Sequence, residues 1–220
     1  MSSDTSCLAL RLEGPLQSWG FDSQYNRRNT GLLPIKSAIA GMCCAAFGYC
    51  RGSTEEQGFL KRFTTTKMIA FAIPKVIAQR SEKHKLQVRR LQDYHTVQNL
   101  KKSCILTHRQ YLTDASFGVL LEGSTELLES ITEALRDPVW GIWLGRKTCI
   151  PSAPVLAGLS PTKNEALALL VGDKPIEEFF RQEDVEVFAD GKDSLPDSAV
   201  SFASDKRLFS PRRVMNYPGK

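Results

Sequence analysis

The basic stretch from Lys75 to Arg109 constrains the fold most, because it is too polar and too irregular to belong to a buried core. It contains nine lysine or arginine residues and two acidic residues, although the whole 220-residue chain has a formal net charge of only +5. Leu86 and Val88 alternate with polar neighbours, and the stretch has no helical period. We therefore predict that about residues 75–115 form a long β-hairpin, or a partly ordered loop, that projects from a sheet.

The charge of this stretch indicates a partner with many negative charges. Positive side chains interleaved with aromatic ones are typical of a nucleic-acid interface, and a local patch fits a defined site better than general coating. A solvated basic face is the alternative, and composition alone does not decide between the two. The candidate RNA-binding residues of the stretch are Arg89, Arg90, Tyr94, His95, Lys101, Lys102, His108 and Arg109.

Two β-α-β patterns flank the basic stretch. In the first strand Leu8, Leu10 and Leu12 alternate with other residues, which places three leucines on one face. Together the patterns predict an α+β fold of the ferredoxin-like or RRM-like kind, with a β-hairpin inserted between its middle strands. The predicted order is strand 7–12, helices 34–48 and 54–63, strand 64–73, the insertion, strand 116–121, helix 124–137 and strand 139–143.

The character of the sequence changes after Pro151. Prolines recur, and the predicted elements become short, with a helix near 165–171 and strands near 185–188 and 199–202. We therefore predict two units. They are an RRM-like domain over residues 1–150, which includes the basic hairpin, and a small β-rich C-terminal subdomain over residues 151–220.

The first predicted helix combines a regular apolar face with an unusual N-terminus. Pro34 is favoured as the first helical residue, because its missing N–H costs nothing there. The opposite face carries small residues such as Gly41 and Gly48, which permit close approach by a partner. Lys36 and Ser37 lie in the first turn, where the helix dipole disfavours a cation unless an anion is nearby. They predict either a phosphate-binding site or merely a solvated lysine.

The six cysteines favour neither a metal site nor a disulfide framework. They form no C-x-x-C pair and have no zinc-finger spacing with histidines, so we expect no metal and no cofactor. Cys7, Cys43 and Cys44 lie in apolar patterns that are typical of core residues. The N-terminus lacks a signal-peptide pattern, and the longest apolar run is shorter than the about 20 residues that a membrane helix needs. These features predict a soluble, cytoplasmic protein that contacts no membrane.

Five stretches of the chain together resemble one known family. They are LRLEGPLQSWG (10–20), PIKSAIAG (34–41), DYHTV (93–97), RQYLTDASFGV (109–119) and WLGRKTCIPSAP (143–154). In this order and spacing they resemble the fifth-numbered Cas protein family of the RAMP superfamily, in its type I-E CRISPR Cascade branch. The resemblance is firm over about residues 8–158 and weak in the C-terminal part.

The resemblance implies a specific role. Such proteins have an RRM-like domain with a protruding thumb hairpin, and they bind the repeat-derived 5′ handle of the CRISPR RNA. They contact the Cascade backbone subunit and the large subunit that reads the PAM, and they meet target DNA only through the complex. Proteins recognise single-stranded RNA by aromatic stacking and phosphate neutralisation, which the basic stretch can supply. We therefore expect CRISPR RNA as a partner and no catalytic activity.

The resemblance also assigns residues outside the basic stretch. Gly145, Arg146 and Lys147 correspond to a glycine-containing loop that faces RNA. Packing of Trp19 beneath its own loop is an equal alternative to an RNA contact, and Tyr111 and Phe117 fit a core position better. The other side of the RNA is expected to be lined by Trp19, Arg27, Arg28, Lys36 and Ser37.

A metal-independent endoribonuclease is the first competing function. Cleavage through the RNA 2′-hydroxyl needs a base and an acid, and Tyr94, His95 and His108 are residues of the right type. Relatives in the type I-C branch process CRISPR RNA, whereas in the type I-E branch a different subunit does so. His108 stands where the type I-E motif has an aromatic residue, which keeps this alternative open. A free-standing RRM-type RNA-binding protein is the third hypothesis, although the RNP1 pattern of glycine and aromatic residues is absent.

Overall fold

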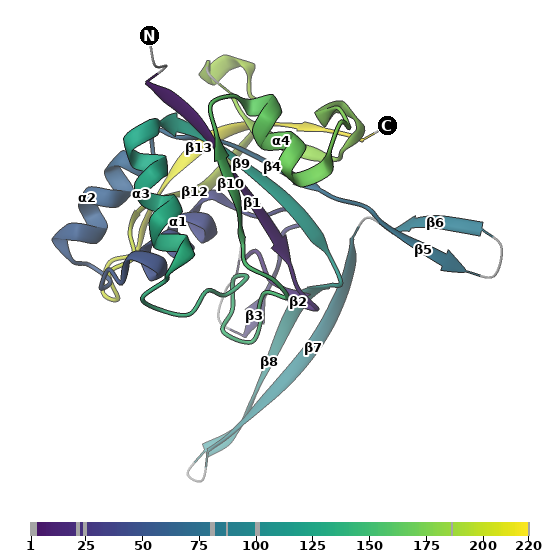
Figure 1. The fold of residues 1–220 in the computed structure, drawn as a ribbon. Helices are drawn as coiled ribbons and strands as arrows, with labels where there is room; N and C mark the ends of the chain where they lie inside the picture. The colour runs from purple at the N-terminus through teal and green to yellow at the C-terminus, as the bar shows by residue number, and fades with distance from the viewer. Residues whose placement is uncertain are drawn as a thin grey trace.

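The chain has a mixed α/β fold in which antiparallel sheets are combined with helices (Figure 1). The computed structural model describes residues 4–20, 23, 26–79, 82–86, 88–99, 102–185 and 187–219. Lys101, one of the predicted RNA-binding residues, lies outside these described residues. Within them, the helices are all too short or too polar to cross a membrane.

The largest sheet has seven strands in the order β10-β1-β9-β4-β11-β13-β12, and each neighbouring pair is antiparallel. The pairing of β1 with β9 runs from Thr5 opposite Ser124 to Glu13 opposite Ser116. The strands are β1 (Thr5–Glu13), β4 (Lys67–Ala72), β9 (Ser116–Ser124), β10 (Leu156–Ser160), β11 (Arg181–Asp184), β12 (Asp193–Ser201) and β13 (Leu208–Tyr217).

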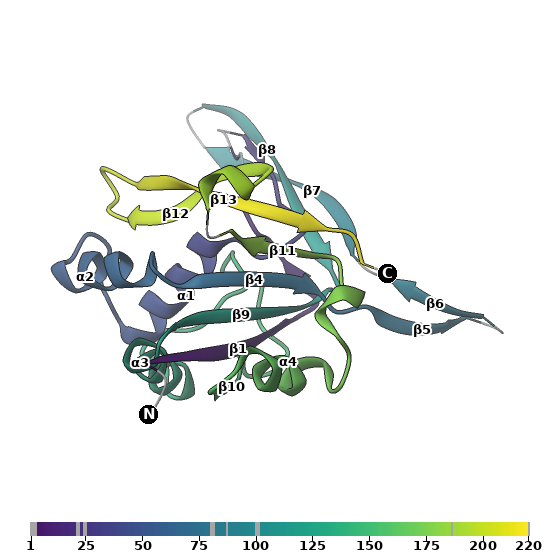
Figure 2. The same cartoon turned by 90° about the horizontal axis from the view of Figure 1, so that it is seen from above.

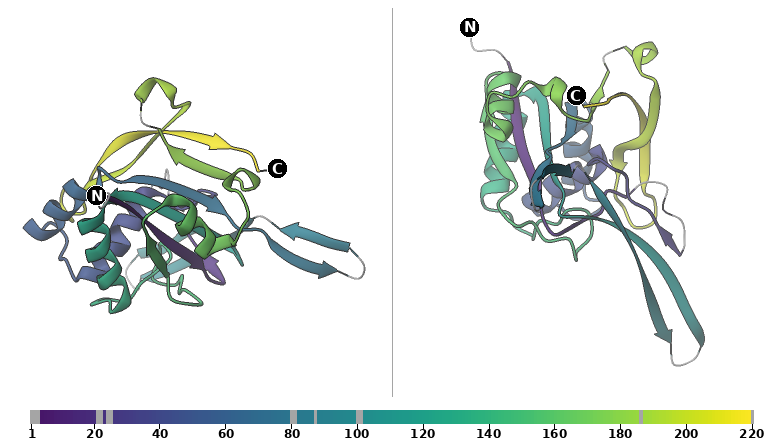
Figure 3. Two further views of the ribbon diagram at one scale, coloured as in Figure 1. Left: turned by 45° about the horizontal axis from the view of Figure 1, so that its top comes forward. Right: turned by 90° about the vertical axis from the view of Figure 1, so that its right-hand side faces the viewer.

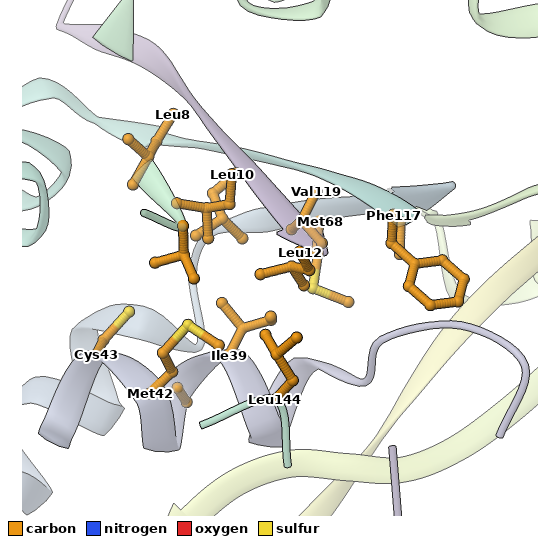
Figure 4. Close-up of a cluster of buried hydrophobic side chains, with 14 of the residues drawn as sticks. Leu8, Leu10, Leu12, Ile39, Met42, Cys43, Met68, Phe117, Val119 and Leu144 are labelled. Atoms are coloured by element: carbon orange, nitrogen blue, oxygen red, sulfur yellow. The ribbon is translucent and has the colours of Figure 1, made fainter. Parts of the chain in front are cut away.

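Both faces of this sheet are covered by helices. The predicted alternation in β1 is confirmed, because Leu8, Leu10 and Leu12 all pack on the helix α1 side of the sheet (Figure 4). Cys7 and Ala9 belong to a second apolar cluster, which α4 covers. The helices are α1 (Lys36–Phe47), α2 (Thr54–Phe63), α3 (Thr125–Arg136) and α4 (Lys163–Val171).

The cysteines that were predicted to lie in the core do so. Cys7, Cys43 and Cys44 are all buried. Burial raises the pKa of the Cys7 and Cys44 thiols to about 12, so both stay protonated at neutral pH. These thiols therefore serve packing rather than chemistry.

The segment 139–143 is not a strand, so the predicted position of the fourth strand is wrong. The N–H groups of Val139 and Trp140 donate to the carbonyl oxygens of Ala46 and Ala45, at 2.9 and 3.1 Å. The segment therefore donates hydrogen bonds to carbonyl groups in the last turn of α1, where the regular helical hydrogen-bond pattern ends. The strand that instead pairs with the outer side of β1 is β10.

The insertion contains two hairpins where the sequence predicted one. β5 (Lys75–Gln79) pairs with β6 (Glu82–Leu86), and β7 (Arg89–Asn99) pairs with β8 (Lys102–Thr113). Figures 1 and 3 show that the two hairpins leave the body of the protein in different directions. β8 also pairs with two short strands of the long N-terminal loop, β2 (Leu16–Gln17) and β3 (Arg27–Arg28).

Residues after 150 contribute strands to both edges of the large sheet. β10 forms one edge, and β12 forms the other. β11 pairs directly with β4, with Arg181 opposite Phe71. The division of the chain at residue 150 into two units stays a prediction.

Helix α1 starts slightly later than predicted, and its small-residue face is occupied. The first helical residue is Lys36, with Ile35 at the N-cap, so Pro34 precedes the helix. On the small-residue face, Gly41 lies against Phe202, and Gly48 lies against Val139. The close approach that these glycines permit is therefore used by the chain itself.

Candidate nucleic-acid interface

The base of the β7–β8 hairpin gathers positively charged residues from segments that are far apart in the sequence. β8 lies between β7 and the short strand β3, which runs parallel to it. Neighbouring strands are about 4.8 Å apart, so residues in register across all three strands lie within reach of one short ligand. We call this region, from β3 across β8 to β7 and including Arg146, the hairpin base.

One face of the hairpin base carries a row of three different side chains. Tyr94 on β7 is opposite His108 on β8, and His108 is in register with Arg27 on β3. Tyr94 has 68% of its surface exposed, and Arg27 is also exposed. The main-chain N–H of His108 donates to the carbonyl oxygen of Asn26 at 2.7 Å, which holds β3 in place. This row offers a ring for stacking and a guanidinium for a phosphate.

The other face of the hairpin base is built around arginines. Asp93, Arg109 and Arg28 form the next row across the three strands. Arg146 comes from the loop after α3, and its guanidinium lies 4.8 Å from the ring centroid of Tyr111. It donates to the carbonyl oxygen of Arg28 at 2.9 Å and to that of Gln110 at 3.2 Å. These contacts fix Arg146 beside the other arginines while leaving it partly exposed.

Gly145 is required for this position of Arg146. Its φ of +97° belongs to the region that favours glycine. A Cβ atom at this position would lie 1.8 Å from the carbonyl oxygen of Ser18. Ser18 is in turn tied to the same loop, because its N–H donates to the carbonyl oxygen of Leu144 at 3.0 Å. The glycine predicted to face RNA therefore acts by letting the loop pack against the N-terminal segment.

The three residues of the catalytic alternative do not converge. Tyr94 and His108 are cross-strand neighbours on one face of the hairpin. His95 belongs to the opposite face, where its Nε2 lies 2.8 Å from Oδ2 of Asp93. An acid and a base that act on one phosphodiester must both reach it, so only the Tyr94–His108 pair has that geometry.

Three other predicted cations, Arg89, Arg90 and Lys102, lie at the two ends of the β7–β8 hairpin. Arg89 and Arg90 begin β7 and are exposed, opposite Thr113 and Leu112 of β8. Lys102 begins β8, at the far end of the hairpin from them. Lys147 is exposed next to Arg146.

Trp19 is part of the core. Its side chain is fully buried and meets Phe117 edge to face, with ring centroids 6.4 Å apart. The main chain at Trp19 is bound to Thr30 and Gly31 on the other arm of the loop. The structure therefore places Trp19 beneath its loop, in agreement with the packing alternative, and Tyr111 and Phe117 are buried as expected.

Lys36 and Ser37 are buried rather than presented to a ligand. Lys36 has only 4% of its surface exposed, and its Nζ lies 3.1 Å from Oδ2 of Asp184. The main-chain N–H of Lys36 donates to Oδ2 of Asp197 at 3.1 Å. The anion at this helix N-terminus is therefore a carboxylate of the protein itself, which explains a cation in the first turn without a phosphate.

Arg212 completes a buried network of two cations and two carboxylates. Its guanidinium binds Asp197 through Nε at 2.6 Å and Nη2 at 2.9 Å, and it also binds Asp184. Burial lowers the pKa of Lys36, although Asp184 opposes that effect. For Arg212 burial acts in the same direction, but its bonds to both carboxylates outweigh it and raise the pKa. We call Lys36, Asp184, Asp197 and Arg212 the buried network.

No metal site accompanies either cluster in the part of the chain that the structure describes. Among those residues, no group of three or more His, Cys, Asp or Glu side chains is placed to hold a metal ion. The hairpin base offers cations, hydrogen-bond donors and an aromatic ring to a ligand, all from the protein's own side chains. This combination is suited to a short single-stranded polyanion.

The fold and the hairpin base define a class of protein, namely an antiparallel α/β protein with an arginine-rich projecting hairpin. The model of the family described as CRISPR-associated protein (Cas_Cas5) matches residues 7–215. The chain therefore belongs to the CRISPR-associated Cas5 family.

Individual relatives agree with this assignment. The protein of Escherichia coli (strain K12) named CRISPR system Cascade subunit CasD is 30% identical over 176 residues, which are 75% of this chain and 76% of that protein. A chain of a CRISPR RNA-guided surveillance complex is 27% identical, with a TM-score of 0.72 over 97% of this chain and 90% of that chain. A crystal structure of a Cas protein is 30% identical, with a TM-score of 0.67 over 96% and 93% of the two chains.

Proposed function

We propose that this chain is a non-catalytic subunit of a type I-E Cascade complex, in which it holds the 5′ handle of the CRISPR RNA. The observation that carries the proposal is the convergence of Arg27, Arg28, Arg109 and Arg146 at the hairpin base. Similarity to CasD and to a chain of an RNA-guided surveillance complex supports the same role. In this proposal the arginines neutralise phosphates, and Tyr94 stacks on a base.

The proposal includes a ferredoxin-like core that carries the β7–β8 hairpin as a thumb. In chain order, the four strands of the two β-α-β units are β1, β4, β9 and β10, and they lie side by side as β10-β1-β9-β4. With α1 and α3 as the two crossover helices, this order supports the ferredoxin-like interpretation.

The proposed protein partners are the Cascade backbone subunit and the large subunit that reads the PAM, within a complex in the cytoplasm. Target DNA is met indirectly, through the complex. Leu91, Ile105 and Leu106 are 45%, 55% and 42% exposed on the β7–β8 hairpin. A two-stranded hairpin is only marginally stable by itself in water. Exposed apolar residues along it are therefore an argument that another protein packs against the hairpin.

The test uses a labelled full-length CRISPR repeat RNA incubated with the purified protein in EDTA. The products are run on a denaturing gel and on a native gel. We expect a shifted band on the native gel and intact RNA on the denaturing gel. A protein that leaves the RNA unshifted would contradict the proposal.

The endoribonuclease alternative predicts a different denaturing gel, with one discrete cut. If such a cut is observed, Tyr94→Phe and His108→Gln should each abolish it, because these two side chains share a face. His95→Gln is the matched control on the opposite face. A free-standing RNA-binding protein is distinguished by co-purification, because it would not bring the other Cascade subunits with it.

A further inference from the structure

A groove is lined by residues of helix α2 and of the β12–β13 hairpin. These two elements lie at the end of the molecule opposite to the β5–β6 hairpin (Figure 2). Its cavity volume is about 870 Å³. This groove contains no residue of the hairpin base, and the proposed RNA-binding role makes no use of it.

The helical wall of the groove is one stripe of α2. Gln57 and Lys61 of α2 and Thr64 at its C-cap line the groove, and their spacing of four and three residues places them on one side of the helix. The other side of the helix is anchored, because Phe59 and Phe63 are buried in the core. The lining side chains are therefore held on a fixed helix.

The opposite wall is a strand surface with an apolar floor. Val200 on β12 and Leu208 on β13 are 47% and 42% exposed, and Ala199 lies beside them. The turn between the two strands closes the groove with Ala203, Ser204, Asp205 and Lys206.

Glu56 holds the two walls together. Its side chain is buried, and its Oε2 accepts hydrogen bonds from the N–H of Gly52 at 2.9 Å and of Phe202 at 3.2 Å. Gly52 precedes α2, and Phe202 begins the connection between β12 and β13. One carboxylate thus ties the helical wall to the strand wall. The groove is therefore preformed, and binding would require little conformational entropy to be lost in forming it.

The ionisable residues that line the groove are mostly basic. Among the described lining residues, Arg51, Lys61 and Lys206 are basic and Asp205 is acidic. Exposed apolar side chains lie between these charges, and none of the described residues that line the groove is aromatic. Nucleic-acid bases bind by stacking on aromatic faces, so this lining favours carboxylates and aliphatic side chains over RNA.

We propose that this groove binds an acidic peptide segment of a partner protein. Carboxylates of the peptide pair with Arg51, Lys61 and Lys206 at the rim, and an apolar side chain of the peptide rests on Val200 and Leu208. The occupant is identified by charge complementarity and by the apolar floor.

The experiment selects peptides from a displayed library of short random sequences against the purified protein. We expect enriched peptides to carry several Asp or Glu residues around an aliphatic residue. Their affinity should fall about tenfold for the double variant Lys61→Glu and Lys206→Glu, because rim charges then repel the peptide. The neutral variant Lys61→Gln and Lys206→Gln should lie between it and the unmodified protein.

The matched control is Lys174→Glu with Lys192→Glu, which changes the net charge equally at exposed sites outside the groove. It should bind the peptides like the unmodified protein. Thermal melting confirms that each variant is folded, and repeat-RNA binding is measured in parallel as an independent function. The inference is overturned if no peptide binds better to the protein than to the groove variant. A repeat RNA that loses affinity for the groove variant alone would likewise replace the peptide by nucleic acid.

Discussion

The hairpin base and the buried network are both clusters of cations, yet they do opposite things. The hairpin base exposes Arg27 and Arg28 and has Asp93 as the only carboxylate in its rows. In the buried network Lys36 and Arg212 are matched by two carboxylates that come from β11 and β12. The network has as many carboxylates as cations and its side chains are only 5–11% exposed, whereas the hairpin base keeps its positive charge for a ligand. A cation therefore indicates a binding site only when the folded chain leaves it without enough acidic partners.

The sharpest way to break this comparison is to remove a carboxylate of the buried network. Asp197→Ala removes the carboxylate that accepts hydrogen bonds from the Arg212 guanidinium and from the main-chain N–H of Lys36, and both of these donors are buried. We expect the free energy of unfolding to fall by about 3–5 kcal/mol, because an unpaired buried charge is strongly destabilising. Urea denaturation measures this change.

The control for that experiment is Asp205→Ala, on the same β-hairpin but exposed. Its effect should stay within about 0.5 kcal/mol. Equal losses for the two variants would show that the network contributes no more than an ordinary surface carboxylate, and the contrast between the two clusters would fail.

The next largest effect concerns the glycine that places Arg146 at the hairpin base. Gly145→Ala introduces a Cβ against the carbonyl oxygen of Ser18 at a positive φ, so we expect a loss of about 1–3 kcal/mol. RNA affinity should fall with it, because Arg146 moves away from Arg28 and Gln110. Gly20→Ala is the matched control, since nothing lies within 4 Å of an added Cβ there. Unchanged melting of the Gly145 variant would contradict this account.

Much of the fold could be predicted from local patterns. The alternation of Leu8, Leu10 and Leu12 predicted β1, and the serine cap at Ser124 predicted the start of α3. The error at 139–143 arose because its apolar residues look like a strand, although their main chain is used to complete α1. That interaction depends on tertiary contacts, which periodicity does not report.

The site could be predicted less completely, for the same reason. The basic stretch drew attention to Tyr94, His108 and Arg109, which the structure brings into one region, and their role in RNA binding stays a prediction. The assignment of Lys36 to a ligand could not be tested without knowing that Asp184 and Asp197, about 150 residues later, lie beside it. No local signal in the sequence marks those two aspartates as its partners.

A smaller effect, on RNA binding but not on stability, is expected from substitutions in the exposed cluster, the hairpin base. Replacing Arg27 and Arg109 by alanine should weaken repeat-RNA binding by about tenfold and reduce the slope of log affinity against log salt by about 1.4. Stability should stay within about 1 kcal/mol, because Arg27 is exposed and Arg109 is only partly buried. Native gels at several salt concentrations measure both quantities. The control is Lys174→Ala with Lys192→Ala. A similar loss of affinity from the control would mean that the hairpin base contributes only through the net charge of the protein.

The smallest effect is expected from an ion pair whose two side chains are both exposed to solvent. Arg62 Nη1 lies 3.9 Å from Oε1 of Glu126, and the two side chains are 55% and 91% exposed. Exposed pairs are screened by water and salt, so a double-mutant cycle of Arg62→Ala and Glu126→Ala should give a coupling of about 0–1 kcal/mol. Measured by urea denaturation beside Asp197→Ala, this value isolates burial as the variable that separates the clusters. A coupling as large as the Asp197→Ala loss would mean that charge pairing alone, irrespective of burial, stabilises this fold.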